Sequence, residues 1–312
     1  MEMDQATTLR KLVSIESAKK RKLGTERCQG FSEEQRRPKV FAVTSGKGGV
    51  GKTNVTGNLA IACQRMGKRV LIFDADLGLA NVDILFGLHP KYQIGEVIKG
   101  EKELSEIIVE GPEGVSMIPA CSGIQELAHL TGGQKMNLLN DFENLSNQFD
   151  ILLIDTGAGI SDNVLFFSLA AEERIVVVTP EPTSITDAYA LIKVLYIQHK
   201  TKTFILLSNM VRDEKEGRLI YENLNRVITR FMQDASVDYG GYIPWDPLLP
   251  KAVSRREPVI RAFPEGTSSQ SFKTLAHFLI HQAEARPMDG NIQFFWKRMM
   301  HISLDQPHET RN

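Results

Sequence analysis

The stretch from Gly46 to Thr53 constrains this 312-residue chain most, because glycines and lysines are concentrated where a strand meets a helix. It consists of Gly46, Lys47, Gly48, Gly49, Val50, Gly51, Lys52 and Thr53. An apolar run at 40–44 precedes it and predicts a buried strand. Apolar residues at helical spacing follow over 54–66, and Gly67 ends that helix. Because glycines let backbone N–H groups turn inward and a helix N-terminus adds partial positive charge, the stretch predicts a phosphate-binding loop.

The two lysines and the threonine of this loop predict different contacts. We expect Lys52 to reach the β- and γ-phosphates of a nucleotide and the Thr53 hydroxyl to ligate Mg²⁺. Lys47 is an additional cation that an ordinary phosphate loop does not need. It could stay near its own phosphates or reach a nucleotide held by a facing subunit. The alternative, a glycine-rich turn without a ligand, is disfavoured because every spaced residue of the motif is present.

Polar residues follow three further predicted strands. Asp74 and Asp76 come after the strand at 69–73, and Asp155 comes after four apolar residues at 151–154. The last arrangement is typical of an acid that holds Mg²⁺ through water. Asn209 follows the strand at 203–208 on the ligand side of the sheet, where a ligand contact and an ordinary turn residue are equally supported. Alternating strands and helices predict an α/β fold with a doubly wound, mostly parallel sheet, whose carboxyl edge carries these side chains.

The order G-K-G-G-V-G-K-T resembles the deviant phosphate loop (Walker A) of the MinD/ParA family of ATPases, and the resemblance covers residues 40 to about 285. It implies a MinD-like P-loop NTPase fold, ATP and Mg²⁺ as cofactors, slow ATP hydrolysis and an ATP-dependent homodimer bridged by Lys47. It also implies that Asp76 orients the attacking water and that Asn209 contacts adenine. Directly after Asn209 this chain has Met210, where many relatives have an arginine that contributes to the contact with the base. A catalytically dead binding module is disfavoured by the intact Lys52, Thr53, Asp76 and Asp155.

Three separated segments resemble the flagellar-number regulators of that family (the FleN/FlhG type). They are the N-terminal element, residues 181–193 and residues 290–296. The N-terminal element contains Asp4, Gln5, Ala6, Leu9 and Arg10. The resemblance implies that this element stimulates a flagellar GTPase of the signal-recognition type (the FlhF type). Flagellar switch proteins and a flagellar transcription activator are further partners that it implies. A cell-division-site regulator of the MinD type and a partitioning ATPase of the ParA type remain alternatives.

The two ends of the chain lie outside the predicted domain at 40–286. Residues 1–39 are polar and basic, and we expect a mobile arm that carries either a short helix or a solvated tail. The tail at 287–312 begins with Pro287, and Pro287 and Gly290 detach the segment at 291–304 from the core. Over 291–304, apolar and aromatic residues fall on one arc of a helical wheel and basic residues on the other side. We expect this helix either to lie in the headgroup layer of a membrane or to dock on the protein's own surface.

Composition narrows the class of protein. The net charge is −1, so a direct nucleic-acid partner is not expected, although a basic face would be invisible to this argument. Cys28, Cys63 and Cys121 lie far apart, whereas a cluster-carrying reductase with this loop would need paired cysteines. No apolar run approaches a membrane span. We therefore expect a cytoplasmic protein, with reversible association with the inner face of the membrane only through the tail.

Overall fold

The computed structural model describes residues 38–76, 81–119, 141, 145 and 148–285. All of them belong to one compact unit, residues 37–312. The predicted partner-binding element at residues 4–10, the segment at 77–80 that follows Asp76, and the amphipathic tail at 287–312 lie outside the described residues. The arm and tail therefore stay predictions.

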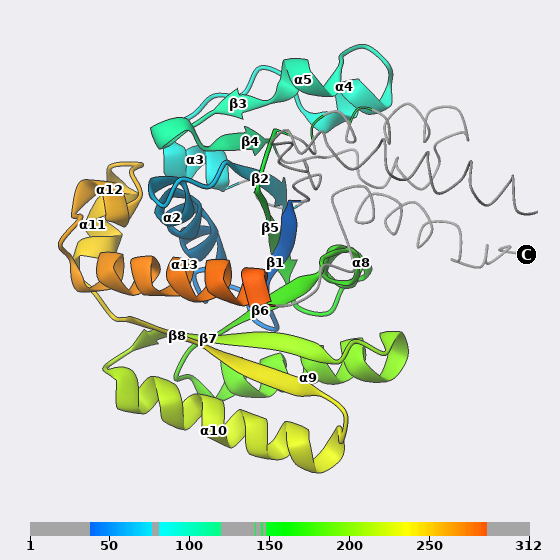
Figure 1. Ribbon diagram of the computed structural model, residues 1–312, viewed down its shortest axis with the longest axis vertical. Coiled ribbons are helices and arrows are strands. Elements are labelled where there is room, and N and C mark those ends of the chain that lie inside the picture. Colours follow the sequence, from blue (N-terminus) through cyan, green and yellow to red (C-terminus); the bar gives the residue numbers. More distant parts are fainter. Residues whose placement is uncertain (1–37, 77–80, 120–140, 142–144, 146–147, 286–312) are drawn as a thin grey trace, which may run out of the picture. The chain divides into compact units, whose positions relative to one another are not determined.

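The described strands form one sheet in the order β3-β4-β2-β5-β1-β6-β7-β8 (Figure 1). All neighbouring strands are parallel except β3 and β4, which are antiparallel. The strands are β1 Lys39–Ser45, β2 Val70–Ala75, β3 Val109–Glu110, β4 Ser116–Ile118, β5 Ile151–Ala158, β6 Glu173–Val178, β7 Thr203–Val211 and β8 Ser236–Pro244. The doubly wound, mostly parallel sheet predicted from the sequence is confirmed.

Helices cover both faces of the sheet. On one face, α2, α3 and α11–α13 pack on alternate residues of the central strands, including Val43 and Leu153. On the other face, α4, α5, α8, α9 and α10 pack on the residues between, including Ala42 and Leu152. The helices are α2 Lys52–Arg65, α3 Val82–Phe86, α4 Ile94–Ile98, α5 Leu104–Ile107, the 3₁₀ helix η1 Pro112–Gly114, α8 Asp162–Ala170, α9 Pro182–His199, α10 Glu214–Phe231, α11 Leu248–Ser254, α12 Val259–Ala262 and α13 Thr267–Ala285.

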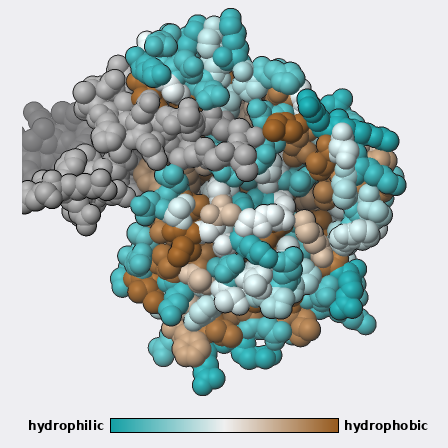
Figure 2. Space-filling model, turned by 180° about the vertical axis from the view of Figure 1, so that it is seen from behind, coloured by the Kyte–Doolittle hydropathy of each residue, from teal (hydrophilic) through white to brown (hydrophobic). Residues whose placement is uncertain are grey.

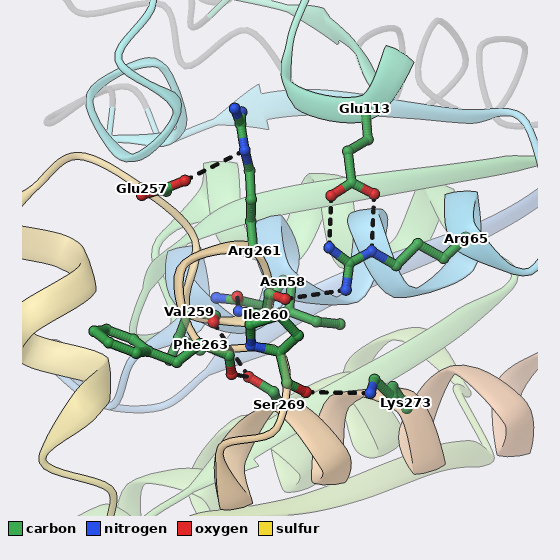
Figure 3. A network of polar contacts seen from close by, with 11 residues as sticks. Asn58, Arg65, Glu113, Glu257, Val259, Ile260, Arg261, Phe263, Ser269 and Lys273 are labelled. Carbon is green, nitrogen blue, oxygen red and sulfur yellow. Dashed lines mark hydrogen bonds and ion pairs between the residues drawn. The ribbon is translucent and has the colours of Figure 1, made fainter.

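Side chains of α2 hold α12 against it. The Asn58 Oδ1 atom accepts a hydrogen bond from the Ile260 N–H at 3.0 Å, and an Arg65 N–H donates to the Ile260 carbonyl at 3.0 Å. The Arg65 guanidinium also binds both carboxylate oxygens of Glu113 in η1, at 2.6 and 2.8 Å (Figure 3). Both backbone polar groups of Ile260 are thus satisfied from α2. The helix that follows the phosphate loop is fixed along its length.

The surface mixes apolar and polar side chains. Figure 2 shows the back of the molecule, where hydrophobic residues form several separate patches between hydrophilic ones. Exposed large apolar side chains include Ile160, Ile197, Phe231 and Trp245. Scattered exposed apolar residues are normal in folded proteins and need no partner by themselves.

Candidate nucleotide-binding site

The phosphate loop leaves β1 at Ser45 and enters α2 at Lys52. Two glycines of the loop are required by geometry. A Cβ atom on Gly46 would lie 2.2 Å from the backbone of Asp187 in α9, so no larger residue fits. Gly51 has a φ of 90°, and its Cβ would lie 2.7 Å from the Asn209 amide. The loop is therefore shaped by close contact with α9 and β7 as well as by its own conformation.

Lys52 is buried and directed at the end of β1. Its Nζ atom donates to the Ser45 hydroxyl at 3.0 Å, and the Ser45 Oγ atom donates to the Lys47 carbonyl at 2.7 Å. Burial lowers the pKa of Lys52, and the negative charges of Asp155 and Asp76 oppose that shift. Since a phosphate supplies a stronger acceptor than a hydroxyl, the ammonium is ready to exchange Ser45 for a phosphate oxygen.

Thr53 and Asp155 meet where a magnesium ion would be held. Asp155 is 1% exposed and accepts hydrogen bonds from Thr53 and, at 3.2 Å, from the Thr56 hydroxyl. Burial raises the pKa of Asp155 to about 6, and the bond from Thr53 opposes the rise. A hydroxyl and a carboxylate are the hard oxygen donors that Mg²⁺ prefers. These two residues, predicted as metal ligands from widely separated parts of the sequence, fit that ion.

Asp74 and Asp76 have different surroundings. The sheet register places Asp74 directly beside Asp155. Its carboxylate accepts from the backbone N–H groups of Asp76, Asn81 and Val82 at 3.2 to 3.3 Å. Burial and the neighbouring Asp155 raise the pKa of Asp74 to about 7. Asp74 therefore anchors the segment that carries Asp76. These hydrogen bonds depend on the path of the backbone after β2, which the spacing of residues in the sequence does not show.

Lys47 points to the N-terminus of α9. Its ammonium forms an ion pair with Glu181 and donates to the Thr183 hydroxyl at 2.9 Å. Glu181 is the N-cap residue of α9, and its side chain is 63% exposed. An exposed ion pair stabilises a protein by only about 0–1 kcal/mol, so this one exchanges easily for another anion. Sequence reasoning missed Glu181 as the partner of Lys47, although it singled out the segment that contains it.

Asn209 lies against the phosphate loop. Its side-chain amide donates to the Val50 carbonyl at 2.7 Å, and its Oδ1 atom accepts from the Met210 N–H at 3.0 Å. Asn209 and Met210 line a cavity of 80 Å³ together with Pro244 and Trp245. The turn that follows β8 thus lines a cavity beside the loop. The adenine contact of Asn209 itself stays a prediction.

Asp246 supports that turn. It accepts hydrogen bonds from the Leu248 N–H, the Thr267 hydroxyl, and the N–H and hydroxyl of Ser268, at 2.8 to 3.1 Å. Burial raises the pKa of Asp246, but these hydrogen bonds outweigh it and hold the pKa below its ordinary value. Its ionised carboxylate therefore fixes the start of α13 beside the cavity.

Cysteine chemistry is not supported where the structure describes the chain. Cys63 is buried in α2, and burial raises the pKa of its thiol to about 12, which keeps it protonated. Among the described residues, no three His, Cys, Asp or Glu side chains gather closely enough to hold a metal ion by themselves. No helix in the described ranges is both long and apolar enough to cross a membrane.

Known proteins resemble this chain over most of its length. The antiactivator FleN of Pseudomonas aeruginosa is 45% identical over 261 residues, 84% of this chain and 93% of that protein. The flagellum site-determining protein YlxH of Helicobacter pylori is 36% identical over 301 residues, 95% of this chain and 98% of that protein. The septum site-determining protein MinD of Pyrococcus horikoshii, solved with Mg-ADP, has a TM-score of 0.63 at 24% identity, covering 79% of this chain and 97% of that one.

The glycine-rich loop between β1 and α2, with Thr53 and Asp155 beside it, defines a P-loop nucleotide-binding protein. The family model ParA, described as NUBPL iron-transfer P-loop NTPase, matches residues 37–280. The chain belongs to the ParA family. It is a P-loop ATPase of the ParA/MinD type.

Proposed function

We propose that this protein is an ATP-driven dimerising switch that controls the number or placement of flagella. The observation that carries the flagellar role is the similarity to FleN and YlxH, which extends over more than nine-tenths of both proteins. The switch mechanism is supported by the exposed contact between Lys47 and Glu181, because that lysine lies at the surface of its own subunit.

Within one subunit, the chain's residues divide the work of phosphoryl transfer to water. Lys52 exchanges Ser45 for the β- and γ-phosphates and offsets the charge that develops on them. Thr53 and Asp155 would hold Mg²⁺, which neutralises phosphate charge when bound. Asp76 accepts a hydrogen bond from the attacking water and orients it. The Asp74 carboxylate holds the backbone of Asp76 by accepting a hydrogen bond from its N–H group. Asn209 holds the loop at Val50 and borders the adenine.

ATP also controls assembly in this proposal. Proteins of the ParA/MinD family typically dimerise with ATP. Lys47 leaves Glu181 and Thr183 and reaches the phosphates of the facing subunit. Two subunits then close around two nucleotides, and hydrolysis releases them. Partner proteins bind the closed dimer specifically, as the partners of other switch proteins bind loops that are ordered by a γ-phosphate.

The ends of the chain supply the outputs. The element at residues 4–10 stimulates a flagellar GTPase of the signal-recognition type, with Arg10 as the candidate cation toward the partner's site. Flagellar switch proteins and a flagellar transcription activator are further partners of the ATP-bound dimer. The tail at 291–304, for which the sequence predicts an amphipathic helix, associates reversibly with the inner face of the membrane when two copies are presented together, since a single amphipathic helix anchors weakly.

Flagella counted by electron microscopy test the role directly. Cells lacking the protein should recover a normal number or position of flagella with the wild-type gene but not with Lys52→Ala. Lys251→Ala, which removes an exposed lysine of α11, is the matched control and should restore them. Normal flagella in cells that lack the protein would refute the proposal.

Two assays separate the outputs from the ATPase. Deleting residues 1–20 should leave ATP hydrolysis unchanged and abolish stimulation of the GTPase, and Arg10→Ala should do much the same. Trp296→Glu should abolish ATP-dependent sedimentation with anionic liposomes and spare hydrolysis. Full stimulation by the truncated protein would remove the arm from the proposal. Equal liposome binding with ATP and ADP would show that the nucleotide does not control membrane association of the tail.

A further inference from the structure

A second, larger cavity lies along the outer edge of the sheet. Its volume is 780 Å³, and we call it the edge groove. Residues of β8, of the start of α10 and of the start of α13 line it, among them Arg212, Glu214, Tyr242, Trp245 and Glu265. Pro244 and Trp245 also line the cavity beside the phosphate loop, so the two spaces share a wall. None of the nucleotide-binding roles proposed above uses the edge groove.

The groove follows an open strand edge. Strand β8 has nine residues, ends the sheet and, in the part of the chain that the structure describes, pairs with β7 alone. It runs between α10 and α13 (Figure 1). At the opposite end, the sheet finishes in the two-residue antiparallel strand β3. An edge strand offers unpaired N–H and C=O groups, which can bind an extended peptide as a further strand.

The backbone of β8 leaves room for such a peptide. Two irregularities interrupt its pairing with β7, one between Tyr239 and Gly241 and one opposite Met210, and the three pairs between them are regular. Gly241 has a φ of 108°, and a Cβ atom there would meet nothing within 4 Å. The middle of the edge is therefore open on the side where a side chain would otherwise stand. Beyond it, Trp245 is 65% exposed at the end of the groove.

The charges of the groove favour a cationic occupant. Three carboxylates line it, from Asp213, Glu214 and Glu265, and one guanidinium, from Arg212. Arg212 pairs with Glu216 at 3.0 Å and Glu214 pairs with Arg218 at 3.1 Å, so Asp213 and Glu265 carry the remaining charge. The N-termini of α10 and α13 add about half a positive charge each, which leaves the balance negative. The Tyr239 ring already holds the Arg218 guanidinium, 5.2 Å from its centre, and the exposed ring of Trp245 offers a further aromatic face to a cationic side chain.

We propose that the edge groove binds an extended, cationic segment of a partner protein. The segment adds to β8 as a strand and places its Lys or Arg side chains against Glu265 and on the ring of Trp245. Because Pro244 and Trp245 also border the cavity beside the phosphate loop, a bound segment and a bound nucleotide touch the same two residues. Binding of one should therefore change the affinity for the other. Only this coupling rests on the proposed function.

A synthetic peptide, acetyl-VRVRVRV-amide with a fluorescent label, tests the proposal by anisotropy on the full chain. Two control peptides carry Glu in place of Arg, or N-methyl groups on alternate residues, which remove the donors a strand needs. We expect each control to bind at least tenfold more weakly. Glu265→Gln should weaken binding of the Arg peptide about threefold to fivefold and leave ATP hydrolysis unchanged. Glu222→Gln, on the exposed face of α10, is the matched control and should bind normally.

Several results would overturn the inference. Binding that is equal for the Arg and Glu peptides would remove the charge argument, and binding that survives N-methylation would remove strand addition. If no peptide binds and the nucleotide-free protein sediments as a concentration-dependent dimer, the occupant of the edge is a second copy. If the edge groove binds no such segment, ATP hydrolysis and flagellar control are unaffected. If instead the proposed function is wrong, the flagella counted in cells with Lys52→Ala will show it.

Discussion

The two ends of the parallel sheet both bury titratable side chains, yet they serve different purposes. At the carboxyl end, Asp74 and Asp155 lie side by side and their pKa values are raised to about 7 and about 6. At the amino end, burial raises the pKa of Glu172 to about 7, and the positive charge of Lys39 opposes the rise. Burial and pKa shifts alone therefore do not distinguish a ligand site from a structural one.

The partners of the charged groups make the distinction. At the amino end, the buried guanidinium of Arg174 donates to the carbonyls of Ser168, Ala171 and Glu172, close to the end of α8. Its donors are used within the fold. At the carboxyl end, the Lys52 ammonium donates to the Ser45 hydroxyl and, among the residues that the structure describes, to no other side chain. A buried charge indicates a binding site when its partners are weak and easily replaced by a ligand.

The largest expected effect is at the carboxyl end. Lys52→Ala should reduce ATP binding by more than about 100-fold, because the charge-assisted contact to phosphate lies where water is largely excluded. Isothermal titration with ATP and Mg²⁺ measures it, with the melting temperature as a check on folding. Because Lys52 contributes little to the fold, the variant should melt near the wild-type temperature. Retained ATP affinity would place the essential cation elsewhere.

At the amino end the corresponding change should affect stability instead of binding. Arg174→Met leaves three carbonyls without their charged donor, so we expect the free energy of unfolding to fall by about 3 kcal/mol. Urea denaturation measures it, and ATP affinity of the folded variant should be unchanged. Arg226→Met removes an exposed arginine of α10 and is the matched control. Equal stability of the two variants would mean that Arg174 does not support α8.

Asp76→Ala should separate binding from chemistry within the carboxyl end. We expect ATP binding to remain and the hydrolysis rate to fall about 100-fold, because orienting a reacting group contributes on that order. Analytical ultracentrifugation with ATP should then show a persistent dimer, whereas the wild type returns to monomers as ATP is consumed. Hydrolysis at the wild-type rate would show that another group orients the water.

The smallest expected effect is a pH dependence at the amino end. The folded pKa of Glu172, about 7, lies above its ordinary value of 4.5, so its ionisation destabilises the folded state as pH rises from about 4.5 to 7. Glu172→Gln should therefore stabilise the protein by about 1–2 kcal/mol above pH 7 and not below pH 4.5. Urea melts at pH 4.5 and pH 8 compare the two proteins. A gain that is equal at both pH values would rule out titration of Glu172 as its cause.

Local signals in the sequence predicted the frame of the site well. Strand β1, the loop and α2 were expected within two residues, because the apolar pattern and Gly67 mark their limits. Helix α10 begins at Glu214, where the Asp213 side chain caps it by accepting from the Glu216 N–H at 2.9 Å. The Asp-x-x-Glu spacing is a capping signal that would have found this start.

Contacts between distant segments could not be predicted in the same way. The pairing of Lys47 with Glu181 joins residues 134 apart in the chain, and Asn209 reaches the loop at Val50 across 159. The use of Asp74 as an anchor depends on the path of the backbone after β2, which spacing does not determine. Charged residue types marked the edge of the sheet, but which of them remain open to a ligand followed only from their partners.

The hydrogen bonds that join α2 to α12 affect the order in which the protein can fold during synthesis. Asn58 and Arg65 bind Ile260, which is 202 and 195 residues further along the chain. A ribosome therefore completes the phosphate loop long before it supplies the residues that hold the following helix in place. In a growing chain, that helix stays without its partner until nearly the whole domain has emerged. The part of the site that is synthesised first is thus among the last to be finished.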